Sequence, residues 1–172
     1  MPNWCTNQTF IKIKNFDKEK DLEFFNRVIE AAQTNDECDG LLNFLYPVPK
    51  DADTNLCTKV WGTKWDIAYA LHDIDTTKGV LRIVYDTAWD SPTECFQNAV
   101  TRTDDPIWER LQFQTHYLEL GCDFAGESTI EKNNSEIFQF EASYIADNHE
   151  FSGASDDLID FVLSFMGDSD EN

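Results

Sequence analysis

The chain has 172 residues, of which 41% are hydrophobic and 13% aromatic, so it is long and apolar enough for one packed domain and too apolar to be disordered throughout. Its 33 acidic and 13 basic residues give a net charge of −20 at pH 7, which disfavours contact with nucleic acid or anionic membranes. The sequence has no apolar run of membrane-spanning length and no secretory signal, so we expect a cytoplasmic protein.

The five cysteines are widely spaced and form no Cys-x-x-Cys pair, so we predict reduced thiols, no zinc site and no other cofactor. The segment around His72 carries carboxylates at Asp73 and Asp75. It lacks the glycine and glutamate that complete a calcium loop, and we therefore interpret it as a surface loop without a metal.

In the first half of the chain, alternating residues predict a half-buried strand at 9–14, and a periodic apolar face predicts a helix at 18–33 that begins after Asp17. The apolar run 41–46 is expected to be a short strand, and the prolines that follow it are expected to end the strand. The polar stretch 50–58 is expected to be a loop.

In the middle of the chain, the β-branched run 80–85 predicts a central strand. Ser91 is expected to cap a helix that starts at Pro92 and ends near Val100. A second helical stretch is expected after Pro106, with an apolar face made of Ile107, Trp108 and Leu111.

Toward the C-terminus, strands are expected at 116–124 and 136–145, separated by a polar turn at 132–135. Alternation in the second of these places Phe138 and Phe140 on one face, which we interpret as core. Ser155 is expected to cap a terminal helix, followed by a flexible acidic tail at 167–172. Residues 1–166 are predicted to form a single domain.

The predicted order β-α-β-β-α-β-β-α is typical of an α+β fold. We predict a ferredoxin-like sandwich, in which a mostly antiparallel sheet carries helices on one face, with an extra C-terminal strand and helix.

Four segments together resemble a known family: MPNWCTN (1–7), WGTKWD (61–66), TAWDSP (87–92) and YLELGCDFAG (117–126). The family consists of small proteins of bacteriophages, plasmids and genomic islands, described as having a ferredoxin-like domain and mostly lacking an assigned function. The resemblance spans roughly residues 1–127. It implies the fold and a mobile-element origin, and it brings no catalytic residues. Asp90 and the acidic segment after Glu127 depart from the family pattern.

The WGTKWD segment is a candidate ligand site, because two tryptophans and two charged residues fall within six positions. Together with residues expected nearby it can line an aromatic pocket for a small polar ligand, formed by Trp61, Lys64, Trp65, Asp66, Asp86 and Trp89. The structural alternative places the tryptophans in the core and pairs Lys64 with Asp66. A small-molecule-binding or enzymatic domain is therefore the second functional hypothesis.

The negative charge is concentrated near the C-terminus, since residues 119–172 contain fourteen acidic residues and one basic residue, Lys132. Carboxylates held on a strand and a helix can imitate the charge spacing of a nucleic-acid backbone and occupy a basic groove of another protein. The predicted partner-binding residues are Glu131, Glu136, Glu141, Asp147, Glu150, Asp156, Asp157 and Asp160.

The first functional hypothesis is therefore a non-enzymatic, phage-type acidic protein. It would bind a basic host protein that handles nucleic acid or serves in defence. A stronger version of this hypothesis is that the protein inhibits its partner by mimicking nucleic acid. We expect no direct contact with nucleic acid or membrane. The alternative is an acidic face that only keeps the protein in solution.

Overall fold

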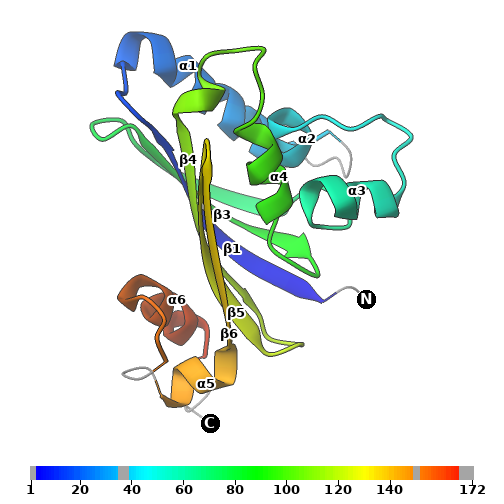
Figure 1. Ribbon diagram of the computed structural model, residues 1–172, viewed down its shortest axis with the longest axis vertical. Helices are drawn as coiled ribbons and strands as arrows, with labels where there is room; N and C mark the ends of the chain where they lie inside the picture. Colours follow the sequence, from blue (N-terminus) through cyan, green and yellow to red (C-terminus); the bar gives the residue numbers. More distant parts are fainter. Residues whose placement is uncertain (1–2, 35–38, 149–151, 167–172) are drawn as a thin grey trace.

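The structure is a computed structural model that describes residues 3–34, 39–148 and 152–166 (Figure 1). Over these residues, six strands form one sheet in the order β2-β3-β1-β4-β5-β6, with every neighbouring pair antiparallel. The strands are β1 (Trp4–Ile13), β2 (Ala68–Asp75), β3 (Val80–Ala88), β4 (Leu111–Glu119), β5 (Phe124–Glu131) and β6 (Asn134–Glu141). The α+β class and the antiparallel sheet are thus confirmed.

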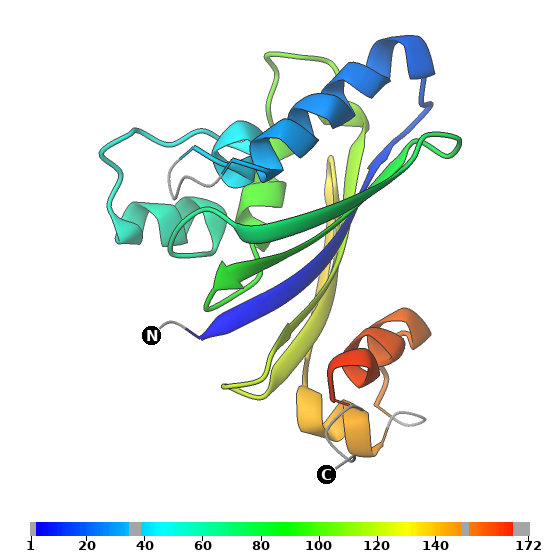
Figure 2. The ribbon, with the colours of Figure 1, turned by 180° about the vertical axis from the view of Figure 1, so that it is seen from behind.

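Four helices cover one face of the sheet, which we call the first face (Figures 1 and 2). They are α1 (Lys18–Ala32), α2 (Leu41–Leu45), α3 (Thr54–Trp61) and α4 (Thr93–Ala99). Alternate strand residues supply the core beneath them: Ile11, Ile13, Leu81, Ile83, Tyr85, Leu111, Phe113 and Ile130. Helices α1 and α4 therefore share a face, as the sequence predicts.

The helix α1 begins as its sequence predicts. The Asp17 side chain accepts the N–H of Glu19 at 3.1 Å, which caps the first turn. Phe25 and Val28 are fully buried, while Leu22 and Ile29 are only half-buried. The apolar stripe thus packs on the sheet with its centre buried and its margins open to solvent.

Two further helices, α5 (Ala142–Asp147) and α6 (Asp156–Met166), lie on the opposite, second face of the sheet. They pack on Leu118 and Ala125 to form a separate small core. Leu118 and Phe113 of β4 are five residues apart, so their side chains leave opposite faces of the sheet. We call α5 and α6 the C-terminal layer.

Two predictions between residues 41 and 58 are wrong. The expected strand at 41–46 is the helix α2, because the Asp66 carboxylate accepts N–H groups from its first turn. The expected loop at 50–58 contains the start of α3, where the Asp53 side chain accepts the N–H of Leu56 at 2.8 Å. The helix ends at Gly62, which has φ +82° and is therefore at a position that favours glycine.

Residues 68–75, interpreted around His72 as a loop, form the edge strand β2. Ser91 does not cap α4: Pro92 is the N-cap residue and no side chain bonds there. The helical stretch expected after Pro106 is a single 3₁₀ turn, Trp108–Arg110, which leads directly into β4. The loop expected around His72 and the helix expected after Pro106 both give way to strands that pair with a neighbour, β2 with β3 and β4 with β1.

The strand predicted at 116–124 is two strands, since β4 ends at Glu119, the chain turns, and β5 starts at Phe124. The strand predicted at 136–145 ends at Glu141, where α5 begins. Its supposed core face is also wrong: Phe138 is exposed and only Phe140 packs on the small core, because β6 is the edge of the sheet.

Ser155 does cap α6, since its hydroxyl accepts the N–H of Leu158 at 3.2 Å. The tail at 167–172 lies outside the described residues. Across the part of the chain that the structure describes, no helix has the length and apolar character needed to cross a membrane.

Candidate functional site

The described residues of four segments, 3–7, 61–66, 87–92 and 117–126, meet at one end of the sheet. The N–H of Trp89 donates to the carbonyl of Asn3 at 2.9 Å, and the Thr63 hydroxyl donates to the carbonyl of Ala88 at 2.8 Å. The Asn3 amide lies 3.1 Å from the sulfur of Cys122. Segments far apart in the sequence are thus in direct contact.

Lys64 is held between two tryptophan rings on this surface. Its Nζ lies 4.9 Å from the centre of the Trp65 ring and 4.8 Å from that of Trp89. Trp4 meets Trp65 edge-on at 6.3 Å, and Trp4 and Trp89 are 43% and 48% exposed. We call Trp4, Lys64, Trp65 and Trp89 the tryptophan surface. The Lys64 ammonium group already has aromatic partners within the protein. The exposed rings of Trp4 and Trp89 are the parts of this surface that can contact another molecule.

The structure does not bring together the six residues predicted to line a pocket. Trp61 is fully buried, with its indole N–H donating to the carbonyl of Tyr46 at 2.8 Å. Asp66 is 1% exposed, and Asp86 projects from the second face, where it accepts the Thr6 hydroxyl at 2.8 Å. The structural alternative is therefore correct for Trp61, whereas the expected pairing of Lys64 with Asp66 is not formed.

Asp66 has a structural role that its sequence neighbours do not reveal. Its Oδ1 accepts the N–H groups of Leu42 and Ile67, both at 2.8 Å, and its Oδ2 accepts those of Gly40 and Asn43, at 3.0 and 2.9 Å. Burial raises the pKa of Asp66, while these four donors oppose the rise by stabilising the anion. The carboxylate fixes α2 to the 62–67 segment.

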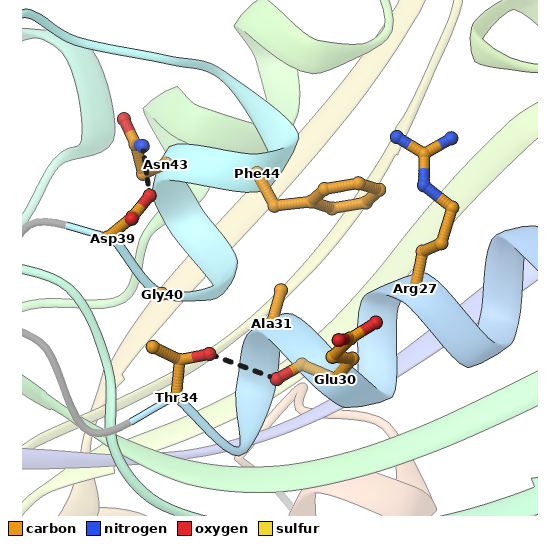
Figure 3. A pocket seen from close by; sticks show the side chains of 8 residues that line it. All are labelled: Arg27, Glu30, Ala31, Thr34, Asp39, Gly40, Asn43 and Phe44. Carbon is orange, nitrogen blue, oxygen red and sulfur yellow. Dashed lines mark hydrogen bonds between the residues drawn. The ribbon is translucent and has the colours of Figure 1, made fainter.

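Three hollows of the structure lie along α1, a fourth lies on β5 and β6 beside Glu136 and Phe138, and a fifth lies between α4 and the turn that joins β5 to β6. The one in Figure 3 has a volume of about 320 Å³, and its lining residues are Arg27, Glu30, Ala31, Thr34, Asp39, Gly40, Asn43 and Phe44. The Arg27 guanidinium lies 5.0 Å from the centre of the Phe44 ring, and the nearby carboxylates are Glu30 and Asp39. The Thr34 hydroxyl donates to the backbone carbonyl of Glu30 at 3.1 Å rather than to a carboxylate. Among the described residues, no group of three or more potential ligands is placed to hold a metal ion.

One predicted partner-binding residue already has a partner within the protein. Glu131 pairs with Lys14 at 2.6 Å and accepts the Gln112 amide at 3.1 Å. Lys14 lowers the pKa of Glu131 by hydrogen bonding to its carboxylate. Glu131 therefore belongs to the sheet rather than to a free acidic face, and Glu150 lies outside the described residues.

The other predicted residues lie on β6 and the C-terminal layer, with Glu136 on the second face of the sheet and Glu141 on the first. All are exposed, and within the described ranges none forms an ion pair with a lysine or arginine. We call them the acidic surface: Glu136, Glu141, Asp147, Asp156, Asp157 and Asp160. Three consecutive elements present them.

Sequence reasoning missed two features near this surface. Ile137 and Phe138 of β6 are 44% and 54% exposed on opposite faces, which the alternation pattern alone interprets as one core face and one solvent face. His116 is buried between Phe10 and Phe161, and neither ring nitrogen has a hydrogen-bond partner among the described residues. No local pattern identifies either feature, because both depend on where the sheet ends and what α6 covers.

Searches against known protein families, curated proteins and solved structures find no match to this chain.

Proposed function

We propose that the protein binds a basic protein partner through the acidic surface and has no catalytic role. The observation that carries this proposal is the separation of charge. Six exposed carboxylates on β6, α5 and α6 have no cationic partner among the described residues, while twelve of the thirteen basic residues fall within residues 1–118.

Such an arrangement suits a partner with a concave basic surface. Carboxylates of one sign on a rigid support raise the rate of encounter with a positive surface and disfavour neutral or acidic competitors. A groove that binds nucleic acid has this character, so we propose a nucleic-acid-handling protein as the partner class. The resemblance to mobile-element proteins is consistent with a host target that the protein inhibits by mimicry.

We further propose that β1, α1, β2, β3, α4 and β4 form a ferredoxin-like unit. Support comes from the order β2-β3-β1-β4 of the antiparallel sheet and from the two helices that connect its halves on the first face. The acidic surface then belongs to an addition, formed by β5, β6 and the C-terminal layer, that extends this unit.

The test neutralises five carboxylates of the acidic surface to their amides: Glu136, Glu141, Asp156, Asp157 and Asp160. A matched control changes the same amount of charge at five exposed positions elsewhere, namely Glu19, Glu23, Glu30, Asp51 and Asp73. Exposed carboxylates contribute little to stability, so both variants should unfold at nearly the wild-type urea concentration.

Wild-type protein and control are expected to retain a basic protein from bacterial lysate at low salt, and duplex DNA should displace it. The five-amide variant should not retain it. Retention should also weaken at moderate salt, because charges at a partly wet interface are screened beyond about 8 to 10 Å at physiological ionic strength. The proposal is wrong if the five-amide variant retains the same partner with unaltered salt dependence, or if wild type retains no basic protein at either salt.

A further inference from the structure

The sheet has two edges, and they differ. At β2 the register with β3 is irregular between Ala68 and Leu71, and such irregularities weaken an edge as a template for another strand. At β6 all eight residues pair with β5 in unbroken register. Eight residues span about 26 Å at 3.3 Å each. Within the described residues no strand lies on the outer side of β6, as its end position in the sheet shows (Figure 1).

The backbone groups that β6 directs outward can be identified. The Tyr117 hydroxyl lies 3.5 Å from the carbonyl oxygen of Phe138, so the backbone of Phe138 faces β5. In an antiparallel strand, residues that direct both N–H and C=O to one neighbour alternate with residues that direct them to the other side. Ile137 and Gln139 therefore direct their backbone N–H and C=O groups away from β5, where a further strand could pair with them.

The side chains around these groups combine apolar and acidic character. Ile137 is exposed on the first face of the sheet and Phe138 on the second. Glu136 and Glu141 flank them five residues apart, and both are exposed. An incoming strand would meet apolar side chains at its centre and a carboxylate near each end.

We propose that the β6 edge binds an extended segment of the basic partner by strand addition, so that the sheet gains a seventh strand. The inference rests on the proposed function in that the partner is basic. The matching segment reads basic–apolar–apolar–polar–apolar–basic: lysine or arginine lies near Glu136 and Glu141, and apolar residues lie near Ile137 and Phe138.

Charge selects this occupant over a second copy of the chain. Each chain carries −20, and edge-to-edge pairing of two copies would bring two acidic surfaces together. A short cationic strand instead meets Glu136 and Glu141 with opposite charge. The backbone bonds and the ion pairs then act on the same segment.

The first test uses the peptide Lys-Val-Phe-Thr-Val-Lys with blocked ends, and Glu-Val-Phe-Thr-Val-Glu as its control. The substitution Gln139→Pro removes one outward N–H without changing charge or breaking a bond to β5, whereas Gln139→Thr keeps the N–H. We expect Gln139→Pro to weaken binding of the lysine peptide by about tenfold or more, as loss of a backbone bond and a distorted edge imply, and Gln139→Thr to leave it within about twofold. Equal binding by all three proteins would overturn the proposal.

A second measurement on the wild-type protein does not depend on how well a variant folds. Saturation with the lysine peptide should slow hydrogen exchange at the amides of Ile137 and Gln139, and the glutamate peptide should not. Unchanged exchange at both amides overturns strand addition. A dimer in sedimentation equilibrium that Gln139→Pro dissociates would show that a second copy is the occupant, which also overturns it.

The two proposals fail in distinguishable ways. If the five-amide variant loses the lysate partner while Gln139→Pro retains it, the acidic surface is the contact and strand addition is wrong. If Gln139→Pro loses the partner while the five-amide variant retains it, strand addition stands and the electrostatic proposal is wrong.

Discussion

The carboxylate of Asp66 allows a sharp prediction, because each of its oxygens accepts two backbone N–H groups. In Asp66→Asn an NH₂ group must replace one of these oxygens. Whichever way the amide is turned, two buried N–H donors then face another donor. The site is closed to solvent, so water cannot replace the lost acceptor.

A buried donor left without a partner costs about 1 to 3 kcal/mol, so two of them should lower the free energy of unfolding by about 4 kcal/mol. For a chain of this size, that loss lowers Tm by roughly 8 to 16 °C. Urea unfolding followed by tryptophan fluorescence measures the free energy, and circular dichroism measures the melting temperature.

The matched control is Asp86→Asn, which makes the same chemical change at a half-buried carboxylate. Asp86 accepts a bond from the Thr6 hydroxyl, and an amide oxygen can still accept it, so the expected loss is below about 1 kcal/mol. If burial kept Asp66 protonated, its amide would be a close mimic. Equal, small losses in the two variants would therefore refute an anionic Asp66 that anchors α2.

Two further predictions concern ionisable groups. Burial lowers the pKa of His116 below 6.5, although Glu127 and Asp157 oppose this, so the folded protein binds fewer protons than the unfolded chain. The free energy of unfolding should thus fall as pH drops below about 6.5. The urea midpoint of His116→Phe should fall less than that of the wild type over the same pH range. An identical fall in both proteins would exclude His116 as its cause. Arg110 bonds both oxygens of the buried Asp21 and lowers its pKa, so this carboxylate stabilises the fold above about pH 4 and the contribution is lost as pH falls through the lowered value. Arg110→Met should lower the free energy of unfolding by about 2 to 3 kcal/mol, which is less than for a fully buried pair because Arg110 is a third exposed. Lys132→Met breaks an exposed pair and should lower it by less than about 1 kcal/mol. Similar losses in the two variants would contradict this prediction.

Several elements could be predicted from the sequence because their signals are local. The helix α1 combines a capping aspartate with an apolar stripe, and the β-branched run in β3 alternates between buried and exposed positions. The charge asymmetry was also available from counting, and it identified all six residues of the acidic surface, five on β6 and α6 and one on α5, none of which forms an ion pair within the described residues. The signals for α1 and β3 depend only on residues a few positions apart, and the charge asymmetry needs no spatial information.

The candidate site needed the tertiary structure, because its contacts join distant positions. The helix α2 exists where a strand was predicted because a carboxylate 24 residues later accepts the N–H of Leu42. Lys64 meets Trp89 rather than Asp66, since the chain returns through β3 to place that ring beside it.

The position of β6 is the clearest case. Its sequence alternates as that of any half-buried strand does, and nothing in that sequence indicates whether another strand pairs with its outer side. The chain instead turns into α5 and crosses to the second face, where Leu118 and Ala125 offer an apolar surface. Composition and local periodicity thus determined α1, α4 and α6, parts of most strands and the acidic character of this protein. Which strand became the open edge, and which carboxylates came to lie beside it, was decided by long-range packing, because side-chain exposure depends on neighbours that the local sequence does not contain.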